Sequence, residues 1–192
     1  MIGETSLFDP AGNRKYLNPR ERMDFYRATH LLTEPAQRAF CLTLFYTGCR
    51  ISEALNLTWK SVDLGEETLV LRTLKQRRDD RYRAVPVPPE LLTLLEARPS
   101  EDSADSPIWK FCRATGWKLI RSRMAVAGLS GIRATPKGLR HSFAITCIQN
   151  QVPLPTVQKW MGHARVETTA IYLDFVGEDE RQWARRIWNT MV

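Results

Sequence analysis

Six side chains in four short stretches of the sequence could together act on a phosphate group. They are Arg50, Lys75, Lys137, Arg140, His163 and Tyr172. Guanidinium, ammonium and imidazole groups donate hydrogen bonds to the non-bridging oxygens of a phosphoryl group. A tyrosine oxygen can attack phosphorus and form a covalent phosphate ester. The combination predicts phosphoryl transfer through a covalent intermediate, with no metal ion and no cofactor.

The first stretch, "TGCRISEAL", places Arg50 directly after a glycine turn and three residues before Glu53. On a helix this spacing allows an ion pair, which at an exposed position is worth only a few tenths of a kcal/mol. The functional alternative is that Arg50 lies at the start of a short helix and that Glu53 orients it. The stretch alone favours the simple surface pair.

The second stretch, "TLKQRRDDRYRAVP", has two strand-forming runs around a polar turn at 76–80, which predicts a β-hairpin. Its positive side chains form either a solvated surface or a probe that enters a DNA groove, where phosphate contacts release counterions. Arg83 is expected among them at the same charged tip of the hairpin. The candidate DNA contacts, named here the hairpin cations, are Lys75, Arg77, Arg78 and Arg81.

The third stretch, "TPKGLRHSFA", begins a helix at about Pro136 and places Lys137 and Arg140 on one helical face. Two like charges at this spacing repel each other slightly unless an anion lies between them. The neighbouring His141 points to another side of the helix and is interpreted as a structural histidine.

The fourth stretch, "MGHARVETTAIY", places His163 nine residues before Tyr172. On one unbroken helix the two side chains would be about 13 Å apart along the axis and could not act on the same atom. Gly162 is a natural helix breaker, so a second short helix could return Tyr172 to the side of His163. The alternative is a core tyrosine with a hydrogen-bonded hydroxyl.

In this order, R-x-x-E, the lysine-bearing hairpin, L-R-H and M-G-H-x8-Y resemble the tyrosine recombinase (phage integrase) family from about residue 18 to about residue 176. The resemblance implies that Arg50 and Arg140 bind the scissile phosphate, that Glu53 supports Arg50, and that Lys75 protonates the leaving 5′-oxygen. It further implies that His163 donates a hydrogen bond to the phosphate and that Tyr172 forms a 3′-phosphotyrosyl link.

Two departures from the family pattern bear on activity. Lys137 occupies the place where the family usually has histidine, and a lysine with a pKa near 10.4 donates to phosphate but is a poor base near pH 7. Type IB topoisomerases resemble this arrangement. Only about seventeen residues precede the first helix of the catalytic region, whereas family members usually carry a DNA-clamping domain of roughly a hundred residues there.

The elements that must position these residues are mainly helical, with one small antiparallel β-sheet, so the fold class is α+β. The expected division is an N-terminal tail over 1–17, a catalytic domain over 18–176 and an amphipathic C-terminal helix over 177–192. In that last helix Trp183, Ile187, Trp188 and Met191 share roughly one face, which either docks on the protein's own core or is exchanged with a neighbouring protomer. The first helix is expected to begin with Asn18 as N-cap and Pro19 at its first position, and further helices are expected over 34–47, 50–57, 88–97, 113–127, 136–149, 155–161, 166–172 and 178–190.

Composition supports a nucleic-acid partner and an intracellular location. The formal net charge of +7 over 192 residues suits a polyanionic partner, and the resemblance implies that this partner is double-stranded DNA. The four cysteines contain no C-x-x-C pair, and neither a secretory signal nor a membrane-spanning run is visible, so a cytoplasmic protein is expected. The resemblance implies a prokaryotic, viral or plasmid origin. The resemblance implies a homo-tetramer on DNA. The alternatives are a DNA-binding or regulatory protein that has lost turnover, and a type IB topoisomerase.

Overall fold

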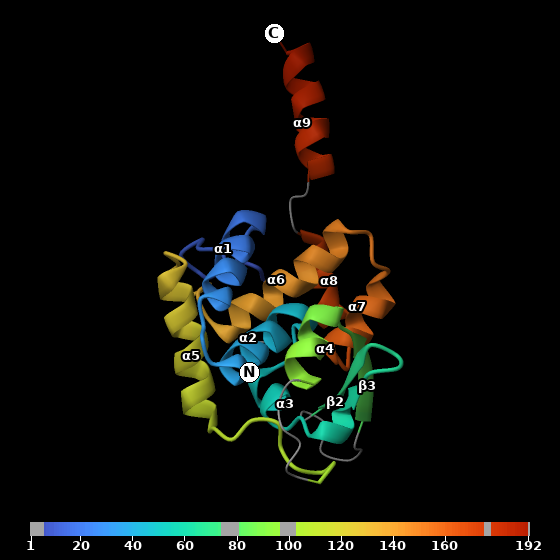
Figure 1. Ribbon diagram of the computed structural model, residues 1–192. Helices are drawn as coiled ribbons and strands as arrows, with labels where there is room; N and C mark the ends of the chain where they lie inside the picture. Colours follow the sequence, from blue (N-terminus) through green and yellow to red (C-terminus); the bar gives the residue numbers. More distant parts are fainter. Residues whose placement is uncertain (1–5, 74–80, 97–102, 175–177, 192) are drawn as a thin grey trace.

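The computed structural model describes residues 6–73, 81–96, 103–174 and 178–191. Figure 1 shows α5 (Arg113–Val126) along one side of the molecule and the β-sheet along the other, with α2 (Pro35–Thr47) and α6 (Pro136–Gln149) between them. The described residues are mostly helical, and the sheet is small and antiparallel, so the predicted α+β class is confirmed.

The first helices begin and end where their capping residues predict. α1 (Pro19–His30) has Asn18 as N-cap, and Asn18 and Glu21 form the reciprocal bonds of a capping box. α2 ends at Gly48, whose φ of 58° is left-handed and favours glycine. α3 (Ile51–Leu55) follows almost immediately, which places Arg50 in the junction between the two helices.

The sheet has three strands in the order β1-β2-β3. β2 (Thr68–Thr73) and β3 (Arg81–Pro86) form the predicted hairpin, with Leu71 opposite Arg83. The turn expected at 76–80 lies outside the described residues. The third strand, β1 (Val62–Asp63), was not expected from the sequence and pairs with the far edge of β2.

The remaining helices agree with the predicted periodicity to within a few residues. They are α4 (Pro89–Glu96), α5, α6, α7 (Leu154–Met161), α8 (Glu167–Ala170) and α9 (Glu178–Thr190), with a 3₁₀ helix at Ile171–Asp174. The segment expected to be one helix over 166–172 is therefore an α-helical turn that continues as a 3₁₀ helix.

Two hydrophobic clusters hold these elements together. The larger cluster contains residues from each of the helices α1, α2, α3, α4 and α5 and from the sheet. Its fully buried side chains include Phe40 and Leu69. The smaller one joins α6 and α7 to Tyr172 and also includes Leu7 and Tyr16. The described part of the N-terminal segment, residues 6–17, thus packs against the same cluster as the candidate nucleophile.

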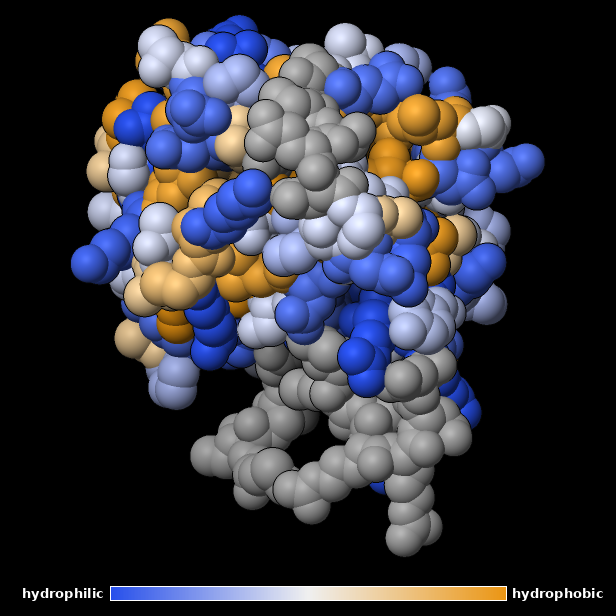
Figure 2. All heavy atoms as spheres, turned by 60° about the horizontal axis from the view of Figure 1, so that its bottom comes forward, coloured by the Kyte–Doolittle hydropathy of each residue, from blue (hydrophilic) through white to orange (hydrophobic). Residues whose placement is uncertain are grey.

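The C-terminal helix α9 projects away from the rest of the molecule in Figure 1. Of the four side chains expected on its apolar face, Ile187, Trp188 and Met191 are exposed, and the side chain of Trp183 lies outside the described residues. On the face shown in Figure 2, several hydrophobic areas lie between hydrophilic side chains.

Candidate active site

Arg50 is held at the junction of α2 and α3 by Glu53. The Arg50 Nη1 donates to Glu53 Oε1 over 2.8 Å, and its backbone N donates to Glu53 Oε2 over 2.9 Å. The Glu53 side chain is fully buried, whereas that of Arg50 keeps 24% of its surface exposed. Glu53 thus orients Arg50 from beneath and leaves the cation accessible, in agreement with the functional alternative.

Arg140 joins three segments of the chain. It lies in the first turns of α6, and its guanidinium donates to the Gly48 carbonyl oxygen over 2.8 Å and to the Met161 carbonyl oxygen over 2.5 Å. Burial, followed by the neighbouring charge of Arg50, lowers the pKa of Arg140 to about 10. Arg140 therefore remains a cation at neutral pH, held close to Arg50.

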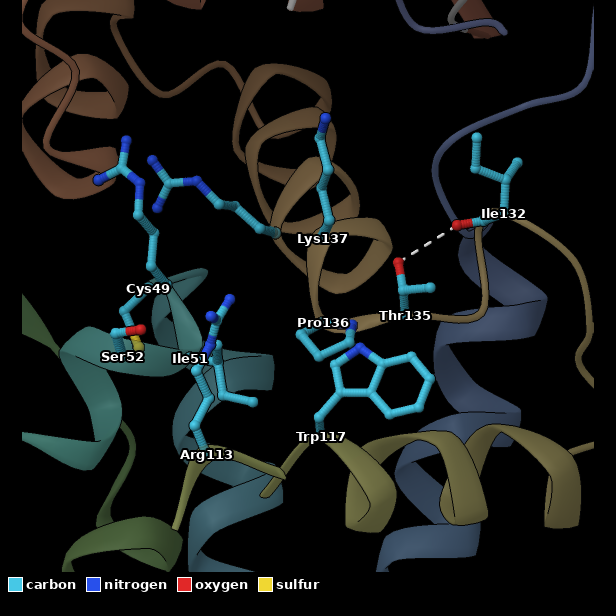
Figure 3. Close-up of a pocket in the computed structure, with 11 residues that line it drawn as sticks. Cys49, Ile51, Ser52, Arg113, Trp117, Ile132, Thr135, Pro136 and Lys137 are labelled. Carbon is cyan, nitrogen blue, oxygen red and sulfur yellow. Dashed lines mark hydrogen bonds between the residues drawn. The ribbon is translucent and has the colours of Figure 1, made fainter. Parts of the chain in front are cut away.

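These cations line one open cavity of about 540 Å³ between α3, α5 and the start of α6. Figure 3 shows Lys137 on α6 above the indole of Trp117, which comes from α5. Trp117 and Ile132 keep 46% and 44% of their surface exposed and supply an apolar wall. The predicted common face of Lys137 and Arg140 is confirmed, because both side chains line this cavity.

His163 borders a second, smaller cavity of about 220 Å³, which Arg50 also lines. α7 ends at Met161, and Gly162 turns the chain with a φ of 61°. The His163 Nδ1 is 2.9 Å from the Thr169 hydroxyl, so α8 holds the imidazole. Arg50 therefore lies between the cavity that contains Lys137 and Arg140 and the one that contains His163.

Tyr172 returns to the side of His163, as the break at Gly162 predicts. The two rings are stacked with centroids 6.3 Å apart and an interplanar angle of 12°. The Tyr172 hydroxyl, however, is 3.0 Å from the Nδ1 of His141, and only 1% of the residue is exposed. In this structure Tyr172 is thus both a neighbour of His163 and a buried, hydrogen-bonded tyrosine.

The described residues hold no group of three or more His, Cys, Asp or Glu side chains that could bind a metal ion. Within the same residues, no helix combines the length and the apolar character needed to cross a membrane.

The model of the Phage integrase family matches residues 15–176. The chain belongs to this family. Tyrosine recombinase XerA of Thermococcus onnurineus is 31% identical over 160 residues, which are 78% of this chain and 55% of the relative. Tyrosine recombinase XerC of Shewanella sp. is 36% identical over 176 residues, which are 81% of this chain and 56% of the relative. The chain thus spans little more than half the length of these relatives.

Solved structures of recombinases have the same fold. A XerA recombinase superposes with a TM-score of 0.72 at 26% identity and covers 89% of this chain and 64% of the solved one. A XerH site-specific recombinase bound to palindromic difH substrate, in a post-cleavage complex, superposes with a TM-score of 0.75 at 25% identity. That match covers 98% of this chain and 58% of the solved one.

Two side chains make contacts that sequence reasoning did not give. His141 is buried and does not line the cavity of Lys137 and Arg140, as expected of a structural histidine, but its partner is the Tyr172 hydroxyl. Arg83 does not belong to the exposed hairpin tip, since only 6% of it is accessible and its guanidinium is 2.6 Å from Glu53. A signal for Arg83 existed, because it alternates with Val85 and Val87, both of which point into the core.

Of the hairpin cations, only Arg81 lies in the described part of the chain. It begins β3 opposite Thr73 and is exposed. Lys75, Arg77 and Arg78 lie outside the described residues.

Proposed function

We propose that this chain cleaves and rejoins DNA as a tyrosine recombinase. The Tyr172 oxygen forms a bond to the scissile phosphorus, and the bond from phosphorus to the 5′-oxygen breaks. The tyrosine proton leaves to a base, and the departing 5′-oxygen gains a proton from a general acid. The 3′-phosphotyrosyl link keeps a phosphoester bond in place of the one lost, so a second 5′-hydroxyl can reverse the step without ATP.

The observation that carries this proposal is the convergence of Arg50, Lys137 and Arg140 on one accessible cavity. Two guanidinium groups present planar pairs of N–H donors that fit the non-bridging oxygens of a phosphodiester. The fixed contacts of Arg50 to Glu53 and of Arg140 to two backbone carbonyls hold these donors before substrate arrives. Such preorganised charge is the largest source of stabilisation for a transition state that accumulates negative charge.

His163 and Lys75 complete the set in this proposal. His163 lies on the other side of Arg50 and donates a hydrogen bond to the same phosphate. Lys75 is the general acid for the 5′-oxygen, because a lysine with an ordinary pKa is protonated at neutral pH. The remaining hairpin cations bind the flanking phosphates.

Tyr172 must leave its buried position in order to attack. Its hydroxyl contacts His141 inside the smaller hydrophobic cluster, whereas the cations face the open cavities. The segment that carries it consists of a four-residue α-helix and a four-residue 3₁₀ helix, which have few internal hydrogen bonds to break. We infer that binding of DNA draws this segment outward and exchanges the contact with His141 for contact with the phosphate.

The substrate is inferred from the relatives, and the assembly from the resemblance of the motifs to the tyrosine recombinase family. The solved XerH structure contains its difH substrate, and the relatives at 31% and 36% identity are named tyrosine recombinases. We infer that double-stranded DNA is the substrate of this chain and that it acts as a homo-tetramer, with α9 exchanged between protomers. The exposed Ile187 and Trp188 on the projecting helix are consistent with such an exchange.

The test is formation of a covalent protein–DNA adduct by wild type and by Tyr172→Phe. DNA sites are selected by binding from a random duplex library and then nicked next to each candidate position, so that the cleaved strand diffuses away and the adduct accumulates. Wild type is expected to form an adduct that survives denaturing gel electrophoresis in EDTA. Tyr172→Phe is expected to fold and to bind the same DNA but to form no adduct, because phenylalanine has no oxygen to attack with. An adduct in Tyr172→Phe would place the nucleophile elsewhere.

A second candidate function is DNA binding without turnover, and the buried Tyr172 hydroxyl is the observation that favours it. This candidate predicts tight DNA binding with no adduct on any selected site. A type IB topoisomerase activity would instead appear as relaxation of supercoiled DNA without exchange of strands between two duplexes.

A further inference from the structure

Arg83 is buried at the meeting point of three segments that carry site residues. It lies on the inner face of β3, and its side chain keeps only 4% of its surface exposed. The Nη2 donates to Glu53 Oε2 over 2.6 Å, the Nη1 to the Thr73 hydroxyl over 2.9 Å, and the Nε to the Trp160 carbonyl oxygen over 2.8 Å. One guanidinium therefore connects α3, the hairpin and the C-terminal end of α7.

The contact with Glu53 reaches Arg50 through a single side chain. The Glu53 carboxylate accepts from Arg83 on Oε2 and from Arg50 on Oε1, and Oε2 also accepts from the backbone N of Arg50. A carboxylate bound by two guanidinium groups has little freedom to rotate. The orientation of the partly exposed Arg50 cation thus depends on where Arg83 holds Glu53.

The contact with Trp160 reaches His163 through the backbone. Trp160 and Met161 are the last two residues of α7, and their carbonyl oxygens accept from Arg83 and from Arg140 respectively. Cations are favourable at a helix C-terminus, where carbonyl groups lack partners within the helix. Gly162 leaves no space beside Arg83, because a Cβ there would lie 2.9 Å from the guanidinium carbon. The Gly162 turn that leads into His163 therefore packs directly against the Arg83 guanidinium.

We propose that Arg83 is a positioning residue for DNA cleavage, which fixes Arg50 through Glu53 and the His163 turn through the Trp160 carbonyl. The inference deepens the proposed function and rests on it. Arg83 does not reach the substrate cavity, since it lines neither of the two cavities that contain the candidate phosphate donors. Its effect on the reaction is indirect, through the placement of groups that do contact phosphate.

The competing explanation is that Arg83 serves stability alone. Buried ion pairs often contribute little net stability, because removing both charges from water is costly. A role in positioning differs from a role in stability in one measurable respect. A positioning role makes the loss of cleavage rate in Arg83 variants depend on the presence of Arg50, whereas general destabilisation does not.

The experiment compares Arg83→Met, Arg83→Lys and a control, Leu91→Ala. Leu91 is fully buried in α4, and the hydrogen bonds of Arg83 and Glu53 do not involve it, so its truncation is expected to lower the melting temperature without removing those bonds. Single-turnover rates of adduct formation are measured on nicked DNA at saturating protein, at a temperature where all variants are folded. Arg83→Met and Leu91→Ala are each also measured in an Arg50→Ala background.

Arg83→Met is expected to lower the rate by about 100-fold, the size of effect that a displacement of about 1 Å can cause. DNA affinity should stay the same, because Arg83 does not contact DNA. In the Arg50→Ala background the further loss should be no more than about tenfold. Arg83→Lys keeps the positive charge beside Glu53 but not all three hydrogen bonds of the guanidinium, so its rate should lie between those of Arg83→Met and wild type. Leu91→Ala should leave the rate within about twofold of wild type.

An equal loss in both backgrounds, a wild-type rate in Arg83→Met, or an equal loss in Leu91→Ala would overturn the positioning role. A wild type that forms no adduct would instead contradict the proposed function, and a second measurement then decides the inference. Hydrogen–deuterium exchange of peptides covering 49–54 and 159–164 should rise in Arg83→Met and not in Leu91→Ala. Unchanged exchange in those peptides would refute the positioning role of Arg83.

Discussion

Replacing Glu53 with glutamine tests whether the carboxylate at the centre of the site holds two cations in place. Glu53 accepts three hydrogen bonds, two from Arg50 and one from Arg83, and its side chain is fully buried. Glutamine has nearly the same shape, but it carries no charge, and its amide NH₂ would face a guanidinium donor. At least one bond is lost, and two arginines remain without their counter-charge.

The size of the effect follows from these contacts. A hydrogen bond to a charged group contributes roughly 1.5–3 kcal/mol, and breaking a buried ion pair by removing one partner costs about 3–5 kcal/mol. We expect Glu53→Gln to lower the free energy of unfolding by about 3–5 kcal/mol, out of a typical total of roughly 5–15 kcal/mol. For a chain of this size the melting temperature should fall by roughly 6–20 °C.

The pH dependence of the free energy of unfolding tests the same contacts independently. Burial raises the pKa of the Glu53 carboxyl, but Arg83 and the bonds from Arg50 outweigh it and hold the pKa below its ordinary value of 4.5. The folded state therefore binds the proton less readily than the unfolded state. The stabilisation is fully present above pH 4.5 and is lost as the pH falls through the folded-state pKa.

Urea unfolding of wild type and Glu53→Gln at pH 7 and at successively lower pH measures both effects. The difference between the two proteins should be largest at pH 7 and should shrink below the ordinary carboxyl pKa, because glutamine does not titrate. A difference under about 1 kcal/mol at pH 7, or one that grows in acid, would refute the reasoning.

Three further predictions concern the site and the DNA interface. Gly162→Ala should lower the rate of adduct formation as Arg83→Met does, because the new Cβ must displace the Arg83 guanidinium and because the backbone φ of 61° disfavours alanine. A wild-type rate would show that this turn is not constrained. Lys137→His should keep or improve cleavage, because imidazole donates to phosphate and can also act as a base near neutral pH, whereas complete loss in the adduct assay would show that the lysine has its own role. DNA affinity should fall by roughly 100-fold between about 50 and 200 mM salt if the four hairpin cations each bind a phosphate, and a flat salt titration would contradict that contact.

Much of the local structure was predictable because it depends on neighbours in the sequence. The capping box of Asn18 and Glu21 needs only residues of the same helix turn, and the end of α2 at Gly48 needs only a left-handed glycine. The break after α7 follows in the same way from Gly162, and it allows Tyr172 to return to the side of His163. Short-range backbone preferences suffice for such features.

The order and spacing of the chemical motifs also identified the family, but they did not show how the site is held. β1 was missed because two residues are too few to show a strand pattern, and they form a strand only by pairing with β2. The four stretches with candidate site residues say which groups are available. They do not show toward which part of the folded protein each side chain points.

The tertiary structure alone decided the contacts between distant segments. Arg140 binds carbonyl oxygens 92 and 21 residues away, and His141 meets the Tyr172 hydroxyl across 31 residues. Arg83 has the same side chain as the exposed Arg81 two residues earlier, and its alternation with Val85 indicates an inward direction, but only the packing of β3 against α3 and α7 supplies its partners Glu53 and the Trp160 carbonyl oxygen. The physical reason is that a charged side chain is stable inside a protein only where packing brings its partners within hydrogen-bonding distance. Those partners come from elements that the local sequence does not place.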